Sequence, residues 1–244
     1  MSARPFPTHA VVLAGGFGTR LRSVVSEVPK PMAPIHGRPF LGYLLAALAE
    51  RGVTAVTLAV GYKGELIEAR LGDRLHGLAL TYSYEREPLG TGGAVALALA
   101  DRPRDSPVWV LNGDTYFDCD LAAVARTHHA AAADVTLALK YVDPADRYGL
   151  VETWGERIVR FREKRPGAGG LINAGVYLLQ PAALGRFDLP RRFSLERDLF
   201  EAHLDGLRLA GATQDGYFVD IGVPEDYARA QAYFGAARGA RPRG

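Results

Sequence analysis

Three glycines follow the first apolar segment of this 244-residue chain, in the order Gly15-Gly16-Phe17-Gly18. Glycine tolerates positive φ and lets backbone N–H groups approach an anion, so such a loop after a strand can hold a phosphate. The loop is not a dinucleotide-binding fingerprint, because Leu21 stands where that motif has its third glycine, and no Walker Gly-Lys-Ser/Thr follows. Taken alone, the segment is equally compatible with a plain glycine-rich turn.

Two cationic residues follow these glycines. Arg20 ends the loop, and Lys30 stands between two prolines, Pro29 and Pro31. The prolines restrict the backbone on either side of the lysine, which favours a fixed charge over a mobile surface one. Because phosphoryl transfer develops charge on phosphate oxygens, an arginine and a lysine beside a glycine loop are suited to that chemistry.

Two aspartates follow apolar segments of the chain. Asp114 ends the segment Leu-Asn-Gly-Asp, and Asp220 begins Asp-Ile-Gly-Val-Pro, just before a helical pattern. Open α/β sheets bind ligands at the carboxyl ends of their strands. Mg²⁺ prefers oxygen ligands and takes one or two carboxylates, with phosphate and water completing its shell. The alternatives are a turn at Asp114 and a helix cap at Asp220.

Apolar runs alternate with helical patterns in the first half of the chain. This order predicts a Rossmann-like, mostly parallel α/β sheet with helices on both faces. The strands expected in this half are 9–14, 54–60, 78–84 and 107–111, with helices at 39–52, 63–71 and 90–100. The second half is less regular, with strands at 135–141, 149–153, 157–162, 171–179 and 207–213 and helices at 121–131, 195–204 and 224–233.

Composition indicates an ordinary globular protein. Formal net charge is +2, and no basic stripe precedes the C-terminal tail, which argues against nucleic-acid binding. No apolar run is long enough to span a membrane, and one cysteine allows no internal disulfide, so we expect a cytoplasmic protein. We expect a single domain at 9–234, a flexible N-terminus at 1–8 and a flexible basic tail at 235–244; a homo-oligomer is compatible with the sequence.

The glycine loop together with Pro29-Lys30-Pro31 resembles the G-G-x-G-T-R-L…P-K-P signature of the sugar-1-phosphate nucleotidylyltransferases. The resemblance extends from about 9 to 234. It implies the nucleotide-diphospho-sugar transferase fold and Mg²⁺-dependent transfer of a nucleoside monophosphate from an NTP to a sugar 1-phosphate, with release of pyrophosphate. It also implies catalytic roles for Arg20, Lys30 and Asp114, and a metal site formed by Asp114 and Asp220.

The resemblance also predicts the two substrate sites. The expected nucleotide-binding residues are Leu13, Ala14, Gly15, Gly16, Gly18, Thr19, Arg20, Lys30, Glu85, Pro88, Gly90, Gly92, Gly93, Asn112 and Gly113. Within this set, Gly92 and Gly93 would let a planar base lie close to the backbone, the alternative being tight helix packing. The expected sugar-phosphate-binding residues are Tyr148, Gly149, Glu163, Lys164, Asn173 and Gly175, with Lys164 neutralising the phosphate.

Within the family, the motifs are most similar to those of enzymes that transfer GMP from GTP to D-glycero-α-D-manno-heptose 1-phosphate. The expected product is GDP-heptose, a precursor of surface polysaccharide. The alternatives are mannose-1-phosphate guanylyltransferase and N-acetylmuramate-1-phosphate uridylyltransferase activity. An inactive nucleotide-sugar sensor is an alternative of another class, which the retention of Arg20, Lys30, Asp114 and Asp220 disfavours.

Overall fold

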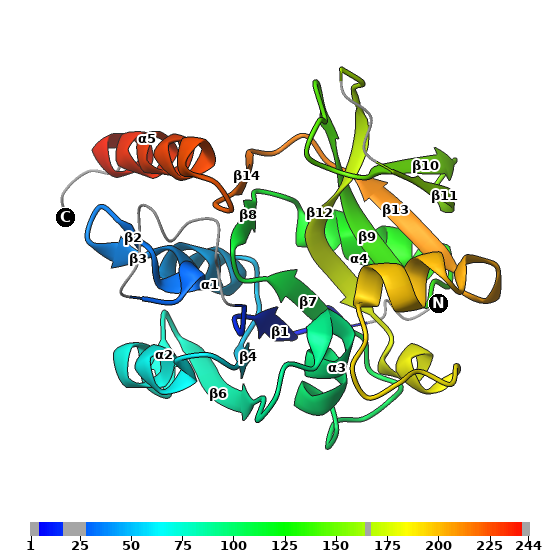
Figure 1. Cartoon of the computed structure of the whole chain (residues 1–244), viewed down its shortest axis with the longest axis horizontal. Helices are drawn as coiled ribbons and strands as arrows, with labels where there is room; N and C mark the ends of the chain where they lie inside the picture. Colours follow the sequence, from blue (N-terminus) through cyan, green and yellow to red (C-terminus); the bar gives the residue numbers. More distant parts are fainter. Residues whose placement is uncertain (1–4, 17–27, 164–166, 241–244) are drawn as a thin grey trace.

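A ten-stranded sheet forms the centre of the molecule in the computed structural model, which describes residues 5–16, 28–163 and 167–240, the last four by backbone alone (Figure 1). The strand order is β10-β11-β13-β9-β12-β7-β1-β4-β6-β5. The strands from the first half of the chain lie together at one end of the sheet, from β7 to β5 in this order. The strands from the second half lie at the other end, from β10 to β12. Within the described residues, no helix combines the length and apolar character needed to cross a membrane.

The first half of the chain builds the parallel part of the sheet, as predicted. β1 (His9–Leu13) pairs in parallel with β4 (Ala55–Val60) on one side and with β7 (Val108–Asn112) on the other. β4 pairs in parallel with β6 (Leu78–Tyr84), and the short β5 (Arg74–Leu75) closes the edge antiparallel to β6. The carboxyl ends of β1 and β7 therefore lie side by side.

The second half makes the sheet mixed. β12 (Gly170–Leu179) runs antiparallel to both β7 and β9 (Val135–Val142), and β13 (Leu209–Thr213) runs parallel to β9. The hairpin β10 (Leu150–Trp154) and β11 (Arg157–Arg162) completes the far edge. No crossover helix separates the strands from β9 to β12, so they can reverse direction at each turn.

Strand alternation divides the core between the two faces of the sheet. Ala10 and Val12 face one apolar cluster, whereas Val11 faces the other. The first cluster is covered by α1 (Phe40–Glu50), α2 (Gly64–Leu71), α4 (Leu121–Ala130) and α5 (Pro224–Ala240). The second is covered by α3 (Gly90–Ala98), η3 (Pro181–Gly185) and η4 (Leu195–Glu201), and the short η5 (Leu204–Gly206) follows η4.

Several elements differ from the sequence-based expectations at their ends. Within the expected flexible N-terminus, Phe6 stacks on Trp109 at 5.9 Å between ring centroids, and the Trp109 indole donates to the Pro7 carbonyl over 2.9 Å. α5 continues to Ala240, so 235–240 are helical where we expected the tail. Alanine and arginine favour helix strongly enough to extend it past Gly235. The helix expected at 195–204 is instead a π-helical segment that ends at Glu201.

Candidate active site

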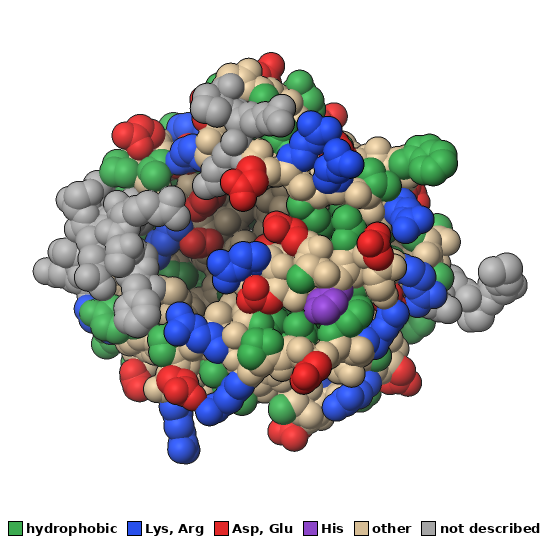
Figure 2. All heavy atoms as spheres, turned by 45° about the vertical axis from the view of Figure 1, so that its right-hand side comes forward, with side chains coloured by type: hydrophobic (Ala, Val, Ile, Leu, Met, Phe, Trp, Pro, Cys, Tyr) green, Lys and Arg blue, Asp and Glu red, His purple; other side chains and the backbone are tan. Residues whose placement is uncertain are grey.

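A cavity of about 690 Å³ opens at the carboxyl ends of β1 and β7. The face drawn in Figure 2 is hollowed near its centre, with acidic and basic side chains around the hollow. Predicted nucleotide-site residues line the cavity, namely Leu13, Gly15, Gly16, Lys30, Glu85, Pro88, Gly90, Asn112 and Asp114. The structure thus brings together predicted residues from four segments of the chain. Gly18, Thr19 and Arg20 lie outside the described residues.

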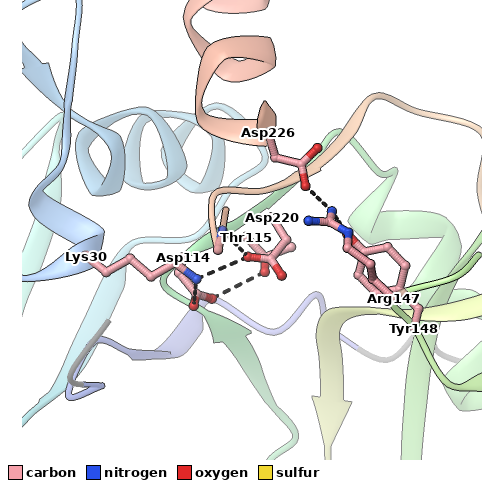
Figure 3. A network of polar contacts seen from close by, with 8 residues as sticks. Lys30, Asp114, Thr115, Arg147, Tyr148, Asp220 and Asp226 are labelled. Carbon is pink, nitrogen blue, oxygen red and sulfur yellow. Dashed lines mark hydrogen bonds and ion pairs between the residues drawn. The ribbon is translucent and has the colours of Figure 1, made fainter. Parts of the chain in front are cut away.

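Lys30 lies between the two predicted metal-binding carboxylates (Figure 3). It begins the short turn η2 (Lys30–Met32), and its side chain is only 11% exposed. Its Nζ is 2.6 Å from Asp114 Oδ2 and 3.2 Å from Asp220 Oδ1. The lysine is therefore held as a fixed charge by two acids, as its flanking prolines led us to expect.

A two-stranded ladder sets the two aspartates next to each other. β8 (Thr115–Phe117) pairs antiparallel with β14 (Phe218–Asp220), and Thr115 lies opposite Asp220 in this register. The Ile221 amide also donates to the Asp114 carbonyl over 3.0 Å. Asp114 precedes β8 and Asp220 ends β14, so local backbone pairing brings the two carboxylates together.

The donor set at this point fits a magnesium ion. Two carboxylates face one region, and the Gly222 amide orients Asp220 by donating to its Oδ1 over 2.8 Å. In the described part of the chain, no cluster of three or more histidine, cysteine or acidic residues could hold a metal. Mg²⁺ usually needs only one or two carboxylates when phosphate and water supply the other ligands, so the pair matches its preference.

Close backbone packing explains two of the glycines around the cavity. The Gly113 amide donates to the Leu13 carbonyl over 2.9 Å, and a Cβ at position 113 would lie 2.6 Å from that oxygen. A Cβ on Gly15 would lie 3.1 Å from the Gly61 backbone nitrogen and 2.9 Å from Glu85 Oε1. Side chains at either position would push the end of β1 away from its neighbours, so both glycines keep the cavity walls close.

Within the expected base-binding segment, Glu85, Pro88 and Gly90 line the cavity, whereas Gly92 and Gly93 do not. Glu85 Oε2 accepts a hydrogen bond from the Leu89 amide over 2.8 Å, which leaves its other oxygen beside Gly15.

The prediction for Gly92 and Gly93 needs correction. Their amides bind the Phe193 carbonyl at 2.9 and 3.3 Å, and a Cβ on Gly92 would lie 2.1 Å from the Phe193 ring. These glycines admit the chain segment around Phe193, which is the tight-packing alternative.

The expected sugar-site residues are divided between two places. Asn173 and Gly175 lie on β12 behind the nucleotide cavity, where a Cβ on Gly175 would come 2.8 Å from Asn112 Nδ2. Tyr148 instead lines a second cavity of about 670 Å³, and Gly149 follows it. Glu163 is exposed just after β11, and Lys164 lies outside the described residues.

The ring of Tyr148 lies close to β14, the strand that ends at Asp220. It packs edge-on against Phe218 at 5.7 Å between centroids. Burial raises the pKa of the Tyr148 hydroxyl, and the Asp220 charge adds to the effect against the opposing Arg147. Tyr148 therefore carries a neutral hydroxyl at physiological pH, available as a hydrogen-bond donor near Asp220.

Two polar residues of this region, Arg147 and Asp226, were not predicted as site residues from the sequence. Arg147 forms an ion pair with Asp226, at the start of α5 (Figure 3). Asp226 also accepts a hydrogen bond from Arg229 over 2.8 Å. Glu196 accepts hydroxyl hydrogen bonds near β12. Asp226 stands six positions after Asp220, so the sequence showed it close to that motif. Its partner Arg147 is distant in the sequence and could not be predicted.

An open α/β sheet with a glycine-lined cavity, a buried lysine and two facing carboxylates defines a phosphate-handling nucleotide-binding protein. The chain belongs to the nucleotidyl transferase family, whose profile matches residues 9–236. Enzymes of this family generally use a divalent metal.

Two similar enzymes carry the same name. The chain is 45% identical over 223 residues to D-glycero-alpha-D-manno-heptose 1-phosphate guanylyltransferase of Aneurinibacillus thermoaerophilus. The matched residues make up 91% of this chain and 96% of the relative. It is 42% identical to the enzyme of the same name from Campylobacter jejuni, over 90% and 96% of the two chains. The crystal structure of HddC from Yersinia pseudotuberculosis complexed with GMP-PN has a TM-score of 0.82 at 33% identity, covering 93% and 99%.

Proposed function

We propose that this protein transfers GMP from GTP to D-glycero-α-D-manno-heptose 1-phosphate, giving GDP-heptose and pyrophosphate. The observation that carries the proposal is the placement of Lys30 between Asp114 and Asp220, at the edge of a cavity large enough for a nucleotide. Similarity over nine-tenths of the chain to two enzymes named for this reaction supports the choice of base and sugar.

The chain's own residues bind and orient the reacting groups. Glycine amides at the end of β1 face the NTP phosphates, and Lys30 stabilises the charge that develops on the transferring phosphate. Glu85 offers its free oxygen to the N–H groups of guanine. Catalysis in this arrangement is positioning with electrostatic stabilisation, since an oxygen of the sugar phosphate attacks the α-phosphorus directly and pyrophosphate leaves.

Mg²⁺ would be held by Asp114 and Asp220, where it would neutralise phosphate charge and help orient the triphosphate. Arg20 and Lys164, which lie outside the described residues, are proposed to contact the triphosphate and the sugar phosphate, respectively. Tyr148, Gly149, Glu163, Asn173 and Gly175 are proposed to surround the sugar. The domain is proposed to span 9–234 and to act in the cytoplasm.

Pyrophosphate release across a matrix of four NTPs and several sugar 1-phosphates tests the proposal. We expect release with GTP and the manno-heptose phosphate, and loss of release when EDTA removes divalent metal. Absence of release with every pair, at protein concentrations where the fold is intact by circular dichroism, would support the inactive-sensor alternative instead.

A further inference from the structure

The carboxylate of Glu196, in the first turn of η4, accepts hydrogen bonds from three hydroxyl groups. Tyr177 Oη donates to its Oε1 over 2.9 Å. Thr91 Oγ1 and Ser194 Oγ donate to its Oε2 over 3.0 and 2.9 Å. Among the described residues, no lysine or arginine forms an ion pair with Glu196, so hydroxyl groups satisfy this carboxylate. The three donors come from α3, from β12 and from the loop before η4.

One end of this network leads to the expected sugar site. Tyr177 is 1% exposed, and its hydroxyl accepts a hydrogen bond from Asn173 Nδ2 over 2.9 Å. Because Tyr177 donates its only hydroxyl proton to Glu196, its oxygen can only accept from the Asn173 amide nitrogen. Asn173 Oδ1 in turn accepts from the Gly175 amide over 3.0 Å. Both polar atoms of the Asn173 amide are therefore assigned, its oxygen to the Gly175 amide and its nitrogen to the Tyr177 hydroxyl.

The other end leads to the nucleotide cavity. Thr91 lines that cavity, and its hydroxyl accepts from the Leu195 amide over 2.9 Å while donating to Glu196. The Phe193 carbonyl also caps the start of α3. The segment 193–196 therefore fixes the start of α3 and the loop before it. Pro88, Gly90 and Thr91 of this region line the cavity.

We propose that Glu196 is a positioning residue that ties the nucleotide-binding loop at the start of α3 to the sugar-binding strand β12. The inference rests on the proposed function, because it requires a nucleotide beside Thr91 and a sugar phosphate beside Asn173. A carboxylate can accept all three hydroxyl protons, whereas a carboxamide cannot, since its nitrogen only donates. Glu196→Gln therefore keeps the size of the side chain and breaks the network.

Steady-state kinetics on four site variants and one control variant tests whether Glu196 links the two sites. Tyr177→Phe, which removes only the sugar-side hydroxyl, should raise KM for the sugar phosphate about 10-fold and change KM for the NTP less than about 2-fold. Thr91→Val should show the reverse split, and Thr91→Ser, which keeps the hydroxyl, should show a smaller change in KM for the NTP than Thr91→Val. Glu196→Gln should raise both KM values. Glu156→Gln, an exposed carboxylate in the β10–β11 turn, is the matched control and should change neither.

Two outcomes would overturn the tie. A purely structural role predicts lower melting temperatures and a smaller active fraction, with both KM values unchanged in all variants. Equal GTP affinity of wild type and Thr91→Val by calorimetry would also contradict it. That binding measurement needs no turnover, so it separates failure of the tie from failure of the proposed function. If the wild type prefers another substrate pair, the variants are compared on that pair.

Discussion

The ammonium group of Lys30 lies 2.6 Å from Asp114 Oδ2, although the two residues belong to different segments of the fold. The lysine therefore neutralises an acid that is also suited to bind a metal. A bound Mg²⁺–NTP complex would compete for the same carboxylate and release the ammonium toward phosphate. The three groups Lys30, Asp114 and Asp220 form one electrostatic unit.

Substitution of either metal-binding aspartate tests that unit. Asp114→Asn or Asp220→Asn removes a charged ligand and should lower kcat at least ~10²-fold at saturating Mg²⁺ while the protein stays folded. Asp120→Asn is the matched control, because Asp120 caps α4 by accepting from Ala123 over 3.1 Å and asparagine caps equally well. Near wild-type turnover in both site variants would show that the metal assignment is wrong.

Lys30→Ala and Lys164→Ala should fail differently. Lys30 is proposed to act on the transferring phosphate, so its loss should fall mainly on kcat. Lys164 is proposed to hold the sugar phosphate, so its loss should raise KM for that substrate and affect the NTP less. Initial rates with each substrate varied in turn give both constants, and identical kinetic changes in the two variants would contradict this division of roles.

The ion pair between Asp226 and Arg147 joins the start of α5 to the loop that carries Tyr148. Arg147→Ala should loosen Tyr148 and raise KM for the sugar phosphate about 10-fold, with GTP affected less than about 2-fold. Asp226 stays paired with Arg229 in this variant, so no unpaired buried carboxylate is created. Asp188→Asn, an exposed acid, is the control. An unchanged KM for the sugar phosphate would remove Tyr148 from the proposed sugar site.

The stability of the fold should depend on pH through His9. Burial, with the nearby Arg102, lowers the pKa of His9 to about 4, whereas the unfolded value is about 6.5. The unfolded chain therefore binds the proton first, and stability present above about pH 6.5 is lost as the pH falls toward 4. The free energy of unfolding should drop by about 2 kcal/mol from this group between about pH 7.5 and pH 5.

Urea titrations of wild type and His9→Gln at both pH values measure the contribution of His9. The drop should be about 2 kcal/mol smaller in the variant. A drop of equal size in the two proteins would place the acid sensitivity elsewhere.

The sequence was sufficient to predict the parallel strands β1, β4, β6 and β7, because each is a compact apolar run between turn residues. The short strands β8 and β14, which set Asp114 and Asp220 side by side, were not predicted. Asp114, Asp220 and Lys30 could be predicted as a cluster, since each stands in a motif of its own. Side-chain partners distant in sequence could not. The space beside Gly92 is filled by Phe193, and nothing local to Gly92 indicates whether a chain segment or a base lies there.

The second half of the sheet was harder to predict for a related reason. Alternating patterns indicate strands at β10 to β12 but not their direction, and the register of β12 against β7 depends on contacts between the two halves of the chain. Asp118 illustrates the same limit on a small scale. Asp118 and Asp120 both precede α4, but only Asp120 caps it, whereas Asp118 pairs with Arg51 of the turn after α1.

The substrate pair is tested most directly by kcat/KM for manno-heptose 1-phosphate and mannose 1-phosphate with GTP, and for GTP against UTP and dTTP. The two sugars differ by one carbon bearing a hydroxyl, and an increment of that size commonly changes selectivity by about 10–200-fold. We therefore predict a preference for the heptose within that range, residual activity on mannose 1-phosphate, and GTP as the best nucleotide. A clear preference for mannose 1-phosphate, or for UTP with an amino sugar phosphate, would contradict the proposed function.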